Sequence, residues 1–192
     1  HTGDPQAAHR TLDTADSLLV LAEGRDGEWV VPTLLRGWLA ADRIEPDDST
    51  GGRTLSPWVR TGLSHVGSAL ERKPGYAPAL GLRGWFHLID WQYNGRGDEH
   101  EIDDAERDLR AAAVPENPSQ AFAWSVLSTL LVERGGFEEA NVAARRMERL
   151  LALLGQRLEA LRTNRPALLV ARPVGPAHGV EREPHPLRLV AL

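Results

Sequence analysis

The sequence predicts an all-α protein assembled from antiparallel helix pairs. Apolar residues recur every three to four positions through seven segments, which is the spacing of one face of an α-helix. No segment sustains the apolar–polar alternation of a half-buried strand, and residues 167–171 (ALLVA) are too short to assign by periodicity. Short breaks rich in glycine and proline separate the segments, and short breaks place consecutive helices antiparallel.

The N-terminal half of the chain contains three expected helices. These helices are residues 7–23, 29–44 and 56–72. Pro32 and Pro57 fall near the start of the second and third, where a missing backbone N–H is tolerated. Residues 45–54 (EPDDSTGGRT) have the composition of a loop. Pro74 and Gly75 end the third helix.

The C-terminal half contains four more expected helices. These helices are residues 77–93, 99–113, 119–134 and 137–162. The breaks between them are residues 94–97 (NGRG), the prolines at 115 and 118, and Gly135-Gly136. The last helix is long for a globular protein.

The character of the sequence changes after the seventh helix. From Pro166 onward, five prolines interrupt every possible helix. We therefore expect residues 5–163 to form a helical domain and residues 164–192 to form a proline-rich tail with little structure of its own.

Composition excludes several classes of protein. A formal net charge of -5 argues against a nucleic-acid-binding protein, and no apolar run is long enough to span a membrane. The absence of cysteine excludes disulfides, thiolate catalysis and cysteine zinc sites. Because the chain starts at His1 and its one methionine is Met147, we expect it to be a piece of a longer protein. The sequence leaves the oligomeric state open and favours the cytoplasm only slightly.

The tetrapeptide Leu-Arg-Gly-Trp occurs twice, at residues 35–38 and 82–85. The residues before each copy also match, since 21–27 and 69–75 each read as a helix end, a turn and a helix start. Similarity at a spacing of tens of residues indicates a duplicated structural unit. We expect the small Gly37 and Gly84 to let the two helices of a pair approach closely, and large residues such as Trp124 to fill the space between pairs.

A later segment resembles the tetratricopeptide repeat (TPR) family. Over residues 117–149, Pro118 precedes a first helix and Gly135 ends it, as in that signature. The other matching residues are Trp124, Leu127, Ser128, Leu131, Ala140, Ala144 and Met147. The resemblance implies stacked helix pairs that form a short α-solenoid with a concave, peptide-binding groove. The two earlier copies diverge from the signature, so we expect three irregular pairs preceded by one helix.

Residues 7–150 also resemble the repeat region that follows the kinase domain in some bacterial serine/threonine kinases. The segments that carry this likeness are 105–112 (AERDLRAA), 117–119 (NPS) and 123–125 (AWS). The resemblance implies a sensor or scaffold part of a larger bacterial signalling protein. The kinase motifs themselves, namely the glycine-rich loop, His-Arg-Asp and Asp-Phe-Gly, are absent from the sequence.

The tryptophans suggest where a partner would bind. Trp38 and Trp85 follow the glycine of each Leu-Arg-Gly-Trp copy, in a neighbourhood that borders the concave surface of tetratricopeptide arrays. Arg36 and Arg83 beside them could clamp a carboxylate or phosphate. The predicted partner-binding residues are Trp38, Trp85, Arg36, Arg83, Phe122 and Thr129. The alternative for the tryptophans is packing within and between pairs.

An acidic run offers the alternative function. Residues 98–108 hold seven carboxylates and one histidine in eleven residues. Such a run could bind a divalent cation, or it could simply complement the dipole at the start of a helix. A helical metal-binding protein or enzyme would use this run with His87 and Asp90, and it requires both residues to converge with His100 or Glu101.

Enzyme motifs are otherwise missing from the sequence. There is no Gly-x-Ser-x-Gly elbow and no phosphate-binding Gly-x-x-x-x-Gly-Lys loop. We therefore expect a protein-interaction or scaffold module that binds a protein or peptide. We expect no catalytic residue, no cofactor and no metal ion.

Overall fold

The computed structural model describes residues 5–25, 29–44, 57–93, 99–113 and 120–163. These residues form seven α-helices and no strand, so the all-α prediction is confirmed for them. The helices are α1 (Pro5–Arg25), α2 (Val30–Asp42), α3 (Pro57–Arg72), α4 (Ala77–Tyr93), α5 (Glu99–Ala112), α6 (Ala121–Glu133) and α7 (Phe137–Thr163). Each helix ends within two residues of its expected position. The expected loops at 45–54 and 94–97 and the expected tail at 164–192 lie outside the described residues.

The chain divides into two compact units, His1–Gln156 and Arg157–Leu192. The first unit contains α1 to α6 and most of α7, and the second contains the end of α7. The expected boundary lay a few residues later, between 163 and 164. None of the described helices combines the length and apolar character that a membrane span requires.

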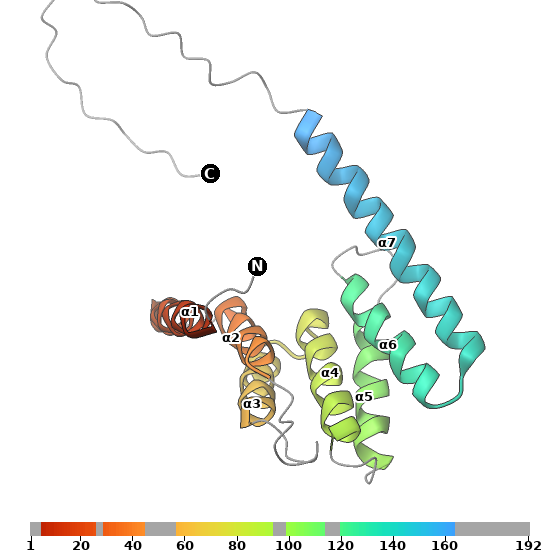
Figure 1. Ribbon diagram of the computed structural model, residues 1–192, viewed down its shortest axis with the longest axis horizontal. Helices are drawn as coiled ribbons and strands as arrows, with labels where there is room; N and C mark the ends of the chain where they lie inside the picture. The colour runs from red at the N-terminus through yellow and green to blue at the C-terminus, as the bar shows by residue number, and fades with distance from the viewer. Residues whose placement is uncertain (1–4, 26–28, 45–56, 94–98, 114–119, 164–192) are drawn as a thin grey trace, which may run out of the picture. The chain divides into compact units, whose positions relative to one another are not determined.

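Neighbouring helices pack against each other throughout the first unit (Figure 1). The most extensive contacts are between α2 and α3 and between α4 and α5, which are the pairs that follow from the sequence. α1 packs on α2, and the pairs are joined by contacts of α3 with α4 and of α5 with α6. In addition, α4 contacts both α2 and α6, the first helices of the neighbouring pairs.

The two repeated glycines lie in close contact with the second helix of their pair. A Cβ atom on Gly37 of α2 would lie 3.0 Å from Cγ2 of Val66 on α3. A Cβ atom on Gly84 of α4 would lie 2.7 Å from Cγ of Leu109 on α5. The prediction that these glycines allow close approach within each pair is therefore confirmed.

Two hydrophobic clusters form the core of the first unit. One lies between α2, α3 and α4 and includes the fully buried Val66, Leu82 and Phe86. The other lies between α4, α5, α6 and α7; it includes the fully buried Leu109 and Leu130 and, from α7, Ala140 and Ala143. The partly buried Leu80 and Trp85 of α4 pack against both clusters.

Two contacts fix the turn between α6 and α7. Gly135 adopts a left-handed conformation (φ 76°), and the N–H of Gly136 donates to the carbonyl of Leu131 at 2.8 Å. The hydroxyl of Ser128 donates to the carbonyl of Ala140 at 2.9 Å. This turn brings the first half of α7 back along α6, where it forms the site described below.

Candidate protein-interaction site

The predicted aromatic residues pack inside the first unit. The rings of Trp38 and Phe122 meet edge to face, with centroids 4.7 Å apart and planes at 70°. This contact joins α2 to α6. Trp85 is partly buried and lies beside Phe86, with ring centroids 5.1 Å apart. In the structure all three predicted aromatic residues therefore contribute to packing.

The predicted arginines are held in internal ion pairs. Arg36 binds Asp16 (Nε to Oδ1, 2.8 Å) and Glu23 (Nη1 to Oε2, 3.1 Å) on α1. Arg83 binds Asp108 on α5 through two hydrogen bonds of 2.5 and 2.8 Å. Asp108 is buried, and its hydrogen bonds raise the pKa of the Arg83 guanidinium.

The two arginines occupy equivalent positions of the repeated tetrapeptide but bind in opposite directions along the chain. Arg36 reaches the preceding helix and Arg83 reaches the following one. Each thereby holds two helices together. Thr129, the remaining predicted residue, is exposed on α6, and its hydroxyl donates to the carbonyl of Ser125 at 3.3 Å.

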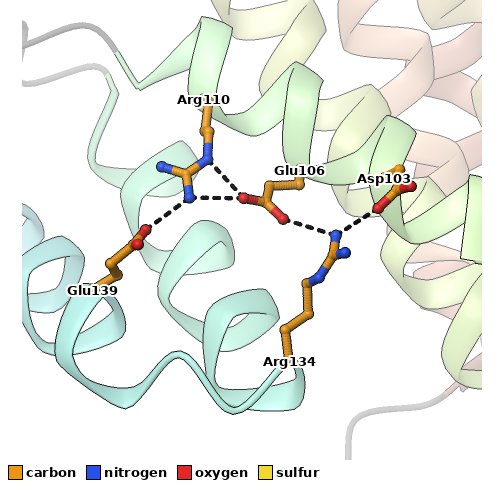
Figure 2. A network of polar contacts seen from close by, with 5 residues as sticks. All are labelled: Asp103, Glu106, Arg110, Arg134 and Glu139. Atoms are coloured by element: carbon orange, nitrogen blue, oxygen red, sulfur yellow. Dashed lines mark hydrogen bonds and ion pairs between the residues drawn. The ribbon is translucent and has the colours of Figure 1, made fainter.

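Residues 99–108 of the acidic run lie on α5, and four of their carboxylates make ion pairs with arginines, namely Asp103, Asp104, Glu106 and Asp108. Glu106 binds both Arg110 (2.7 Å) and Arg134 (2.8 Å), and Arg134 also binds Asp103 at 2.7 Å. Arg110 continues this network to Glu139 on α7 at 2.8 Å (Figure 2). The network connects α5, the end of α6 and the start of α7.

The residues of the alternative function do not form a metal site in the described part of the chain. Among all the described residues, no group of three or more histidine, cysteine, aspartate or glutamate side chains could hold a metal ion. His87 is partly buried on α4. Desolvation of its imidazole is the main reason that the pKa of His87 lies below the usual 6.5. The convergence that the metal-binding alternative requires is therefore not found among the described residues.

An open groove of about 350 Å³ lies between α5, α6 and α7. Apolar side chains line most of it, and four charged residues surround them. The apolar residues are Trp124, Leu127, Leu131, Val142 and Ala143, and the charged residues are Arg110, Glu138, Glu139 and Arg146. Leu127, Leu131 and Ala143 are buried, whereas 52% of Val142 is exposed. The groove thus presents an apolar surface to solvent inside a charged border.

The charged border has a fixed part and an available part. Arg110 and Glu139 belong to the ion-pair network of Figure 2. The guanidinium of Arg146 lies over the ring of Trp124, 5.2 Å from its centroid, in a cation–π contact. Among the described residues, Arg146 and Glu138 have no ion-pair partner. Two opposite charges therefore remain available to a ligand of the groove.

The indole N–H of Trp124 is a further polar group beside the groove. It is buried and has no hydrogen-bond partner among the described residues. Sequence reasoning identified Trp124 but assigned it only to packing. It missed Glu138, Val142 and Arg146, although their spacing of four residues on one helix would have shown that they share a face.

A second groove, also of about 350 Å³, lies beside α1. It is lined by Leu18, Leu21, Ala22, Arg25 and Trp29. Arg25 is the one charged residue among the described residues that line it.

No protein-family model matches this chain, and no curated protein or solved structure shows significant similarity to it.

Proposed function

We propose that this chain is a protein-interaction module of the tetratricopeptide-like type, a short α-solenoid that binds a partner protein or peptide. The observation that carries the proposal is the groove between α5, α6 and α7, with its mostly apolar lining, its half-exposed Val142 and its two available charges. Tryptophan and arginine are the residue types that most often dominate binding energy at protein interfaces, and Trp124 and Arg146 lie together at this groove.

The packing of the helices supports the solenoid part of the proposal. In stacked helix pairs neighbouring units pack on each other, and the first helices of successive pairs lie side by side. The contacts of α4 with α2 and with α6 fit this arrangement. The glycines at equivalent positions of α2 and α4 fit it as well, because both serve the contact within a pair.

The chemistry of the groove favours a protein ligand. A volume of about 350 Å³ accommodates a few apolar side chains of a partner. The charges of Glu138 and Arg146 would orient the partner by pairing with a basic and an acidic residue. The predicted residues Trp38, Trp85, Arg36 and Arg83 make internal contacts instead, which favours the groove at Trp124 as the binding site.

A binding module without catalytic chemistry suits a sensor or scaffold part of a larger bacterial signalling protein, as the resemblance to kinase-associated repeats implies. In such a protein the module would recruit a partner, and the chemistry would belong to another part.

Selection of binders from a random peptide library tests the proposal without knowledge of the natural partner. We expect the selected peptides to bind the wild-type protein and to bind the Val142→Asp variant at least about tenfold more weakly, because a carboxylate in an apolar contact costs more than about 1.4 kcal/mol. Val132→Asp is the matched control, since 47% of Val132 is exposed on α6 and it does not line the groove. Peptides that bind both variants as tightly as wild type would show that the groove is not the site.

A further inference from the structure

A row of three exposed residues runs along α7 at the edge of the groove. Glu138, Val142 and Arg146 are spaced by four residues, so they occupy successive turns of one helix face over about 12 Å. Val142 is half exposed, and both charged residues are exposed. The row therefore presents a negative charge, an apolar side chain and a positive charge in order.

In the segment around this row, charges of opposite sign lie at equal distances on the two sides of Val142. Residues 138–146 read Glu-Glu-Ala-Asn-Val-Ala-Ala-Arg-Arg, with two acidic residues at one end, two basic residues at the other and small residues beside the central valine. When the segment is laid against a reversed copy of itself, each glutamate faces an arginine. A charge pattern of this kind is complementary to itself in the antiparallel orientation.

We infer that a second copy of this chain occupies the groove, with the two α7 helices packed antiparallel about a twofold axis at Val142. Val142 then meets the partner's Val142, Glu138 meets the partner's Arg146, and Arg146 meets the partner's Glu138. Helices that pack through rows of residues spaced by four do so at about −50°, the commonest crossing angle in globular proteins, and the two rows then lie side by side. The interface is isologous, as in most homodimers.

The groove supplies the apolar part of this interface. The second α7 covers the exposed side of Val142 and the edge of Trp124, over which Arg146 already lies. The inference depends on the proposed function, because it names the protein that the proposed binding groove receives.

Charge reversal at the two ends of the row tests the inference in the full chain. Glu138→Arg gives a copy with two positive ends, and Arg146→Glu gives a copy with two negative ends. Each variant alone should dimerise at least about tenfold more weakly in sedimentation equilibrium, since two attractive contacts per dimer become repulsive. An equimolar mixture of the two should recover the dimer, because every glutamate again faces an arginine.

Glu148→Arg is the matched control, since Glu148 is exposed on α7 but lies about 80° or more around the helix from each residue of the row. It should dimerise like wild type, and circular dichroism should show equal helix content in all variants. A wild-type dimer that both reversals leave intact, or a mixture that stays monomeric, would overturn the inference. If the wild type is monomeric but its groove still binds selected peptides, the inference is overturned and the proposed function stands. If the wild type is monomeric and its groove binds no selected peptide, both the inference and the proposed function are overturned.

Discussion

Replacing Gly62 of α3 by alanine should destabilise the protein, although alanine is the better helix former. A Cβ atom at this position would lie 2.0 Å from Cζ of Phe86 and 2.6 Å from both Cε atoms. The Phe86 side chain is fully buried, so the ring has no open space into which it can move. Alanine in a helix interior contributes about 1 kcal/mol relative to glycine. Forcing an extra methyl group into a packed core costs about 1–3 kcal/mol, and displacing a buried phenylalanine costs about 2–3 kcal/mol more.

The net expectation is a loss of about 2–5 kcal/mol in the free energy of unfolding, measured by urea denaturation followed by circular dichroism. Gly67 of the same helix is the internal control, because a Cβ atom there meets nothing within 4 Å. Gly67→Ala should therefore stabilise the protein by up to about 1 kcal/mol. The reasoning would be refuted if Gly62→Ala were as stable as Gly67→Ala, since the contact of α3 with α4 would then not be as close as the structure shows.

Two further predictions concern the charged residues of α4 and α5. Asp108→Asn removes the charge that Arg83 binds in a largely buried pair, and we expect it to lower the free energy of unfolding by about 2 kcal/mol. The double variant Asp108→Leu/Arg83→Met should recover part of this loss, because it leaves no unpaired buried charge. A single variant as stable as wild type would contradict the prediction. Desolvation lowers the pKa of His87 below 6.5 in the folded state. The neutral imidazole therefore contributes its full stability at a pH above the pKa of His87 in the unfolded chain, and this contribution is lost as the pH falls through the lower pKa of the folded state. His87→Gln should therefore show a smaller decrease in urea midpoint than wild type between about pH 7.5 and pH 5, and equal decreases would count against burial of the imidazole.

The helices could be predicted from the sequence because their signals are local. Apolar spacing marks each helix, and glycine or proline marks most of their ends, such as Gly135 after α6. The tetrapeptide repeat also predicted a three-dimensional contact, since a Cβ atom on Gly37 or Gly84 would crowd a side chain of the second helix of its pair.

The partners of the long polar side chains could not be predicted in the same way. Arg36 and Arg83 look equivalent in the sequence, and only the packing of the helices shows that one binds α1 and the other α5. The groove was missed for a similar reason, because it is formed by three helices whose relative positions no local pattern specifies. Trp124 was recognised, but whether a tryptophan fills a core or borders a groove depends on what its neighbours leave uncovered.

The position of α4 has a consequence for how the protein unfolds. Leu80 and Trp85 pack against both hydrophobic clusters, so neither cluster can lose α4 without exposing part of the other. Arrays of stacked helix pairs can in principle unfold one unit at a time. Here the shared helix couples the two halves of the core, and we expect the amides of α2 to α6 to exchange with solvent in a single cooperative opening. α1, whose contacts are with α2, is then the helix free to open separately at a lower free energy.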